Sequence, residues 1–331
     1  MGGVPVREAF KGDKGVAGLG GAMISWLSRE EPVLLRPCRT REQLQAWVRM
    51  YTGLQVPMQA ICPEHQAPMD YLWGAYSEPA RDQVVWASRG GGKTRLGAVA
   101  TLLDLLHKPG VGVRILGGSL EQSCRMWESL LPDLNALVPQ ELVRGFGFGR
   151  RVELKSGSKA GVVAQSEKSV RGLRVQKLRC DEVELFDDEI WEAAQLTVKS
   201  TKLSGPSDSV FDVRGTVEAL STHHKPWGLM SRVLERAREH GTAVVHWCLL
   251  DVLEKCPAER PCQGCLLWDE CQGRAKEAEG FYRIDDAIDM KRRVSTECWQ
   301  TEMLCNRPIT TGRVFPSFDR GVHVLDDKVT R

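Results

Sequence analysis

The sequence predicts an α/β protein with a mainly parallel central sheet and a small cysteine-rich insert. Segments typical of strands and of helices alternate along most of the chain, as they do in folds with parallel strands. A glycine-rich stretch, residues 87–94, lies between an apolar run and a helical pattern. Hydrophobic residues make up 42% of the chain, enough for a core. No run of eighteen apolar residues occurs, so we expect no membrane span and no membrane partner.

The elements are expected in the following order. Residues 1–39 are rich in glycine and mixed charge and are expected to be loosely ordered. Thr40 is a candidate N-cap for a helix that ends near residue 51. The strands expected after it cover residues 83–87, 113–119, 173–181, 216–222 and 242–250, with a hairpin that turns at 156–158. Helices are expected after the glycine-rich stretch and at residues 120–131, 227–240, 285–294 and 296–305.

Residues 87–94 (ASRGGGKT) form the most specific motif. A loop that wraps backbone N–H groups around an anion needs glycines, and the helix after it directs its positive end at the phosphates. Lys93 would reach the β- and γ-phosphates of ATP, and the Thr94 hydroxyl would hold Mg²⁺. Ala87 replaces the first glycine of the usual pattern, but the flanking strand and helix predict a P-loop NTPase. The candidate ATP-binding loop residues are Ser88, Arg89, Gly90, Gly91, Gly92, Lys93 and Thr94.

Arg89 lies inside this loop. Its guanidinium can lie against the γ-phosphate and supply positive charge during transfer, which makes it a candidate catalytic residue. The alternative is a solvated surface arginine.

Asp181 and Glu182 end the strand that would carry a Walker B motif. Asp181 would bind Mg²⁺, directly or through water, and Glu182 would polarise the attacking water as a general base. The long gap after the phosphate loop leaves room for a further strand between the two motifs, as in P-loop ATPases of the additional-strand class. Lys177 and Arg179 make the Walker B strand less apolar than is usual.

The order of four motifs resembles the large terminase subunits of tailed double-stranded DNA viruses. The motifs are ASRGGGKT, EKSVRG, LRCDEVELFDDEIW and LSTHHKPWG, and the resemblance covers about residues 40–325. It implies an ATPase core over residues 40–254 and a motor that drives double-stranded DNA into a procapsid. The alternatives are a superfamily-two helicase or other DNA-recombination ATPase, and a non-catalytic DNA-binding adaptor.

The resemblance also assigns residues outside the two nucleotide motifs. Arg171, in an element with Ser169 and Gly172, would be an arginine finger that reaches a neighbouring subunit's ATP; contact with DNA or solvent is the alternative. Ser221 and Thr222 would form the coupling motif, although N-capping of the next helix would also explain them. In the segment CPEHQAPMDYL, Gln66 or His65 could hydrogen-bond adenine, or the loop could simply pack on the sheet.

The partners and location follow from the same resemblance. They are the portal and procapsid, the small terminase subunit, and further copies of the chain in a ring, in the cytoplasm of an infected bacterial host. Residues 276–331 would form a helical lid and linker that leads toward a nuclease domain, which we expect to be absent from this chain.

The eleven cysteines are an odd number and no export signal precedes them, which favours a reducing cytosol over a disulfide framework. Four of them lie in a predicted insert at residues 255–275, and their spacing suits tetrahedral Zn²⁺. An iron–sulfur cluster or four unligated thiols are the alternatives. Cys62 and His65 form a separate pair that we interpret as structural, because no second pair is near it in the sequence. The candidate metal ligands are Cys256, Cys262, Cys265 and Cys271.

Overall fold

The computed structural model describes residues 33–147, 150–163, 170, 172, 174–204 and 210–308. Within these residues no helix is both long and apolar enough to cross a membrane. The segment 33–37 contains one short 3-10 turn, η2 (Val33–Leu35), and is described by itself. The larger unit begins at Cys38 and contains the elements described below.

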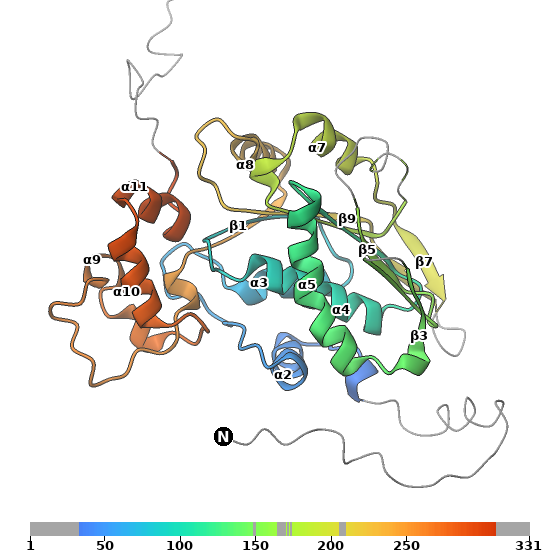
Figure 1. The fold of residues 1–331 in the computed structure, drawn as a ribbon, viewed down its shortest axis with the longest axis horizontal. Coiled ribbons are helices and arrows are strands. Elements are labelled where there is room, and N and C mark those ends of the chain that lie inside the picture. The colour runs from blue at the N-terminus through green and yellow to red at the C-terminus, as the bar shows by residue number, and fades with distance from the viewer. Residues whose placement is uncertain are drawn as a thin grey trace, which may run out of the picture. The chain divides into compact units, whose positions relative to one another are not determined.

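An eight-stranded sheet forms the centre of the larger unit (Figure 1). Its strand order is β10-β1-β9-β6-β2-β5-β4-β3. Neighbouring strands from β10 to β5 pair in parallel, and β4 and β3 extend the sheet in the antiparallel sense. The predicted α/β fold with a mainly parallel sheet is therefore confirmed. The strands are β1 (Gln83–Ala87), β2 (Gly112–Gly117), β3 (Val143–Gly147), β4 (Arg151–Leu154), β5 (Lys159–Val162), β6 (Lys177–Asp181), β9 (Thr216–Ser221) and β10 (Ala243–Trp247).

Strand β9 lies between β1 and β6, pairing Val85 with Leu220 on one side and Cys180 with Ala219 on the other. This is the arrangement of the additional-strand P-loop class, which the sequence predicts. The inserted strand, however, follows the Walker B strand in sequence. The gap between the two motifs is filled instead by β2 to β5, which extend the sheet on the far side of β6.

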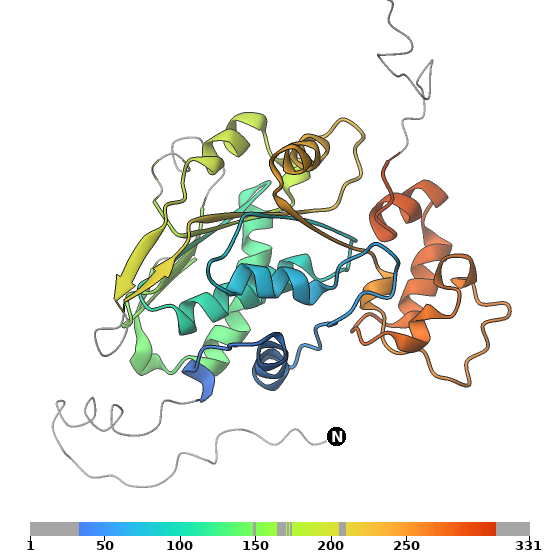
Figure 2. The same ribbon diagram turned by 180° about the vertical axis from the view of Figure 1, so that it is seen from behind.

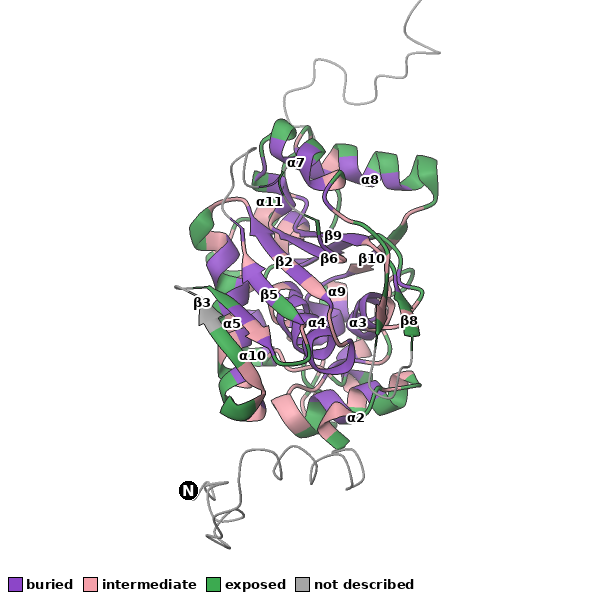
Figure 3. Cartoon of the chain, turned by 90° about the vertical axis from the view of Figure 1, so that its right-hand side faces the viewer, coloured by how far each residue is buried: buried purple, intermediate pink, exposed green. Residues whose placement is uncertain are grey.

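Helices cover both faces of the sheet (Figures 1 and 2). Helices α3, α4 and α5 lie on one face, with α2 beneath them, and α7 and α8 lie on the other. The central strands β1, β9 and β6 are wholly buried between these layers (Figure 3), as expected of parallel strands with two covered faces. These helices are α2 (Arg41–Thr52), α3 (Pro68–Tyr76), α4 (Lys93–His107), α5 (Leu120–Leu137), α7 (Asp188–Gln195) and α8 (Leu229–His240).

Several helix ends follow from local chemistry. The hydroxyl of Thr40 accepts from the backbone N–H of Gln43 and begins α2, as predicted, and Gly53 ends it at φ 69°. Helix α5 continues through Pro132 and ends six residues past the predicted end at 131. Helix α8 ends at Gly241 with φ 68°.

A buried charge network explains the polar pattern of β6. Arg179 is fully buried between α4 and the sheet, where it pairs with Asp104 at 2.7 Å and with Glu218 at 3.0 Å. Lys177, also fully buried, lies 2.8 Å from Glu78. The positive side chains of this strand thus meet carboxylates in the interior instead of solvent.

The remaining elements lie outside the main layers. The β7–β8 hairpin (Thr201–Ser204 and Val210–Val213) forms a separate two-stranded sheet. Beyond β10 the chain forms α9 (Trp268–Cys271), α10 (Ile284–Arg293), α11 (Thr296–Cys298) and one π-helical turn, η8 (Trp299–Met303). Short 3-10 turns are η3 (Gln140–Leu142), η4 (Val183–Leu185), η6 (Leu250–Val252) and η7 (Arg274–Glu277).

Candidate nucleotide-binding site

The carboxyl ends of three adjacent strands bring the predicted catalytic residues together. Strand β1 leads into the glycine-rich loop, β6 ends at Asp181, and β9 ends at Ser221. These strands are parallel neighbours, so their ends share one edge of the sheet. Ligands of open α/β sheets bind at such an edge.

The glycine-rich loop has the conformation that its composition requires. Gly90 and Gly92 have φ values of 73° and 85°, which side chains other than glycine rarely adopt. Lys93 is buried, and its ammonium group donates to the carbonyl oxygens of Ala87 at 3.1 Å and Ser88 at 3.0 Å. The lysine ammonium is therefore held across the loop by two of the loop's own carbonyl groups.

Segments distant in sequence support this loop. The indole Nε1 of Trp247, at the end of β10, donates to the carbonyl of Gly91 at 2.9 Å. A Cβ atom on Gly90 would lie 2.8 Å from the ring of Tyr282, and one on Gly92 would lie 2.9 Å from the ring of Phe281. The chain after the cysteine-rich insert thus packs directly on the phosphate loop.

The two predicted magnesium ligands are in contact. The Thr94 hydroxyl donates to Oδ2 of Asp181 at 2.8 Å, while the buried Oδ1 of Asp181 has no hydrogen-bond partner among the described residues. Burial and the neighbouring Glu182 carboxylate raise the pKa of Asp181 to about 6. A buried carboxylate oxygen beside a hydroxyl fits a hard cation, which would offset this cost. Thr94 and Asp181 would hold Mg²⁺, which neutralises phosphate charge when bound.

Glu182 follows Asp181 in a left-handed conformation, φ 55°, which turns the chain sharply out of the strand. The next backbone groups connect this turn to β9, since the N–H of Glu184 donates to the Ser221 hydroxyl at 3.1 Å. Thr222 instead contacts His224 at 3.0 Å. Ser221 therefore links the predicted coupling strand to the turn that carries the predicted general base.

Of the two candidate arginines, Arg89 and Arg171, the structure describes Arg89. Arg89 is largely exposed, and its Nε lies 2.8 Å from Glu302 in η8, while its backbone N–H donates to the carbonyl of the same glutamate. Contact of its guanidinium with a phosphate would require exchange of this ion pair. Ser169 and Arg171 lie outside the described residues, and Gly172 is exposed.

Gln66 lies beside β10. Its side-chain Oε1 accepts from the N–H of His246 at 3.0 Å, and its Nε2 donates to the carbonyl of Glu64 at 3.3 Å. Backbone groups take one hydrogen bond at each polar atom of this amide, which leaves one N–H and one oxygen lone pair for a further contact. His65 points elsewhere, with its Nδ1 2.6 Å from Asp251.

The four cysteines of the insert line one small cavity of about 30 Å³. The N–H of Cys265 donates to the carbonyl of Cys262 at 3.1 Å, which makes the tight turn expected of this pair. A cavity of this size has room for about one water-sized particle, and four thiols suit a zinc ion. The four predicted ligands thus line one cavity, and the metal itself stays a prediction.

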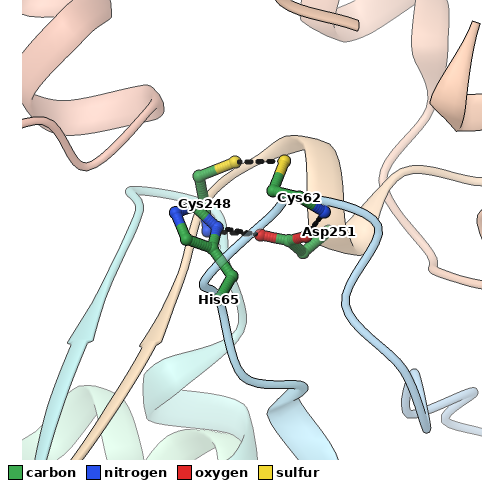
Figure 4. Close-up of side chains that lie close together, drawn as sticks. All are labelled: Cys62, His65, Cys248 and Asp251. Atoms are coloured by element: carbon green, nitrogen blue, oxygen red, sulfur yellow. Dashed lines mark hydrogen bonds and ion pairs between the residues drawn. The ribbon is translucent and has the colours of Figure 1, made fainter.

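A second group of possible metal ligands is not predictable from the sequence. The interpretation of Cys62 and His65 as an isolated pair is incomplete, because the fold brings Cys248 and Asp251 to them (Figure 4). The four ligand atoms all lie within 4.8 Å of one another. The partners are 186 residues or more further along the chain, so no local spacing could have indicated them.

Comparison with known proteins gives the fold. The HK97 bacteriophage large terminase matches with a TM-score of 0.53 and 18% identity over 81% of this chain. A large terminase from a thermophilic bacteriophage has a TM-score of 0.47 and 13% identity, covering 77% of this chain and 56% of that one. The large terminase ATPase domain of Thermus phage P74-26 has a TM-score of 0.44 and 13% identity, covering 67% and 87%. No protein-family profile and no curated protein sequence matches.

Of these three proteins, the HK97 large terminase has the highest TM-score. This likeness shows that the chain has the fold found in the HK97 large terminase, as the sequence motifs predict. The matched region spans 55% of that protein's length. At 18% identity the shared property is the fold.

Proposed function

We propose that the chain is the ATP-hydrolysing motor of a viral large terminase, which translocates double-stranded DNA into a procapsid. One observation carries the proposal: Lys93, Thr94, Asp181 and Glu182 converge at one sheet edge, with β9 between the two motif strands. The likeness to the HK97 bacteriophage large terminase supports packaging over the helicase alternative. Double-stranded DNA, the portal and procapsid, and a small terminase subunit are the proposed partners, in the cytoplasm of an infected bacterium.

Each residue at the edge has a proposed task. The loop N–H groups and Lys93 bind the phosphates, and Thr94 and Asp181 position the metal that neutralises them. Glu182 accepts a proton from the attacking water. Because this chemistry consists mostly of positioning and charge stabilisation, the fixed backbone around these groups matters as much as the groups themselves.

Coupling is proposed to run through Ser221. Its hydroxyl holds the N–H of Glu184, and the Glu184 carboxylate in turn accepts from the N–H of Met230 at the start of α8, at 3.2 Å. A shift of the Glu182 turn when phosphate leaves would thus reach β9 through the Ser221 bond and α8 through the Met230 bond. Thr222 would sense the same change beside His224.

Two arginines are proposed to supply charge. Arg89 would leave Glu302 and move to the γ-phosphate within the same subunit, whereas Arg171 would reach the ATP of a neighbouring subunit in a ring. An arginine supplied in this way is worth about 10³–10⁵ in turnover in related systems. We therefore expect slow hydrolysis by the isolated chain, with a rate per subunit that rises with protein concentration and loses this rise in Arg171→Ala.

The activity is tested by Mg²⁺-dependent ATP turnover of the purified chain, with and without double-stranded DNA. Lys93→Ala should abolish turnover, because it removes the cation that crosses the loop. Lys199→Ala, at an exposed position outside the site, is the matched control and should behave as wild type. Equal turnover of Lys93→Ala and the control would refute the ATPase, and turnover that DNA leaves unchanged would count against a DNA motor.

The cysteine cavity is proposed to hold one Zn²⁺ that closes the insert. Cys262→Ser or Cys265→Ser should lose that ion and increase amide exchange over residues 255–275, while Cys298→Ser serves as a control outside the cavity. Elemental analysis identifies the metal. Iron with a brown colour would establish an iron–sulfur cluster, and absence of metal would mean that the four thiols bind no ion.

A further inference from the structure

We propose that Cys62, His65, Cys248 and Asp251 form a second zinc site, which joins the segment before α3 to the loop after β10. This site is separate from the cysteine cavity of the insert and shares none of its residues. It also does not depend on the proposed motor function, since it rests on ligand chemistry and position alone.

The arrangement in Figure 4 supplies a complete ligand set. The sulfur atoms of Cys62 and Cys248 point toward each other at 3.6 Å. Two sulfurs on one tetrahedral zinc, each about 2.3 Å from the metal, lie about 3.8 Å apart. The thiols are therefore already near the separation that a shared ion imposes.

His65 and Asp251 complete the set. Nδ1 of His65 lies 2.6 Å from Oδ2 of Asp251, and the carboxylate is fully buried. A nitrogen and an oxygen on one tetrahedral zinc are about 3.3 Å apart, so binding would open this hydrogen bond by less than about 1 Å. Two sulfurs, one nitrogen and one carboxylate oxygen favour Zn²⁺ over Mg²⁺ or Ca²⁺, which take oxygen ligands.

The backbone around the site holds the ligands in place. Oδ1 of Asp251 accepts from the N–H groups of Ile61 at 2.9 Å and Cys62 at 2.8 Å. Oδ2 accepts from the N–H of Cys248 at 2.9 Å. One carboxylate thus fixes both cysteine-bearing segments, which is the kind of positioning that metal ligands receive from their surroundings.

The charges of the four ligands nearly balance the charge of Zn²⁺. Two thiolates, one carboxylate and a neutral imidazole around Zn²⁺ carry one net negative charge. The guanidinium of Arg274, from η7 of the insert, reaches the carbonyl of Ile61 at 3.5 Å. This cation would lie next to the site and offset its excess negative charge.

The position of the site gives it a structural consequence. Cys248 directly follows Trp247, the residue whose indole holds Gly91 of the phosphate loop. Cys305 also contacts the carbonyl of Trp247 through its sulfur, at 3.3 Å. A metal at Cys248 would therefore fix the end of β10 and, through Trp247, one side of the phosphate loop.

The test is the zinc content of the full chain, measured by elemental analysis after purification without chelator. Cys62→Ser should lose one equivalent of zinc relative to wild type, and His65→Gln should lower the affinity for that equivalent. Cys38→Ser, another half-buried cysteine, and Cys124→Ser, a buried one, are the matched controls. Cys262→Ser addresses the insert separately, so loss of one equivalent in Cys62→Ser is informative whether or not the insert binds metal.

Two further measurements keep the proposal falsifiable if a variant folds poorly. Wild-type protein loaded with Co²⁺ should show an absorption band of tetrahedral thiolate coordination that weakens in Cys62→Ser. Removal of the metal should increase amide exchange over residues 60–67 and 246–252. Equal zinc in Cys62→Ser and Cys38→Ser would overturn the proposal, as would recovery of native protein with a Cys62–Cys248 disulfide.

Discussion

The hydroxyl of Thr94 donates to the carboxylate of Asp181 across 2.8 Å, although the two residues are 87 positions apart. This contact joins the start of α4 to the end of β6, and it places the two proposed magnesium ligands side by side. The first prediction follows from it.

Asp181→Asn should weaken the Mg²⁺ dependence of turnover. The amide oxygen can still accept from Thr94, so the fold is kept, but the negative charge that attracts the cation is lost. We expect the Mg²⁺ concentration for half-maximal ATP turnover to rise about tenfold or more. A Mg²⁺ titration at saturating ATP measures this, and an unchanged midpoint would remove Asp181 from the metal site.

Glu182→Gln should separate binding from hydrolysis. Without a general base, turnover is expected to fall about 10²–10⁴-fold, while ATP still binds because Lys93, Thr94 and Asp181 are intact. Binding is measured with a fluorescent ATP analogue and turnover by phosphate release. Glu189→Gln, at an exposed position on α7, is the control; equal turnover in both variants would assign the base elsewhere.

Glu184→Gln should change how stability depends on pH. Burial raises the pKa of Glu184 to about 7 from its usual 4.5, so the folded chain binds this proton more tightly than the unfolded chain. Stability from this group is therefore present at low pH and is lost as pH rises from about 4.5 to about 7. The amide cannot ionise, so the variant should gain stability relative to wild type by on the order of 1–3 kcal/mol between pH 5 and pH 8.

Denaturant unfolding of both proteins at pH 5 and pH 8 measures this difference. The amide oxygen can replace the carboxylate oxygen that accepts from Met230, so the comparison isolates the charge. A difference in unfolding free energy that does not change with pH would contradict the argument.

Arg179→Met should destabilise the fold severely. The substitution leaves Glu218 without the buried cation that pairs with it, while Asp104 keeps its ion pair with Lys108. Loss of one partner in such a network costs about 3–5 kcal/mol. Arg125→Met removes only an exposed ion pair with Glu121 and should cost less than about 1 kcal/mol. Denaturant unfolding compares the two, and equal costs would show that the buried pairs contribute little.

The glycine-rich loop and the helix after it are predictable from the sequence because their signals are local. Glycines at 90 and 92 followed by Lys93 specify a turn and a helix start within a few residues, and the structure has both. The hairpin that turns at 156–158 and the cap at Thr40 are predictable for the same reason. In each case the decisive interactions join neighbours in the chain.

Other elements lack such a local signal. Helix α3 buries six of its nine residues, and its less buried side also carries an apolar residue, Trp73. The contrast between an apolar and a polar side, which marks a helix in a sequence, is therefore weak. The acidic stretch that becomes α7 and the exposed β7–β8 hairpin also lie outside the expected elements. The Arg89–Glu302 pair and the partners of Cys62 depend on segments that only the folded chain brings together.

The buried position of Arg179 has a mechanical consequence. Its guanidinium joins β6 to α4 through Asp104 and to β9 through Glu218. Helix α4 could slide or rotate on the sheet only by separating these charges in the interior, at a cost of about 3–5 kcal/mol. The sheet and α4 should therefore move as one rigid body. The segments that move during a cycle of ATP hydrolysis would then be α8 and those held by exposed contacts, such as η8 at Arg89.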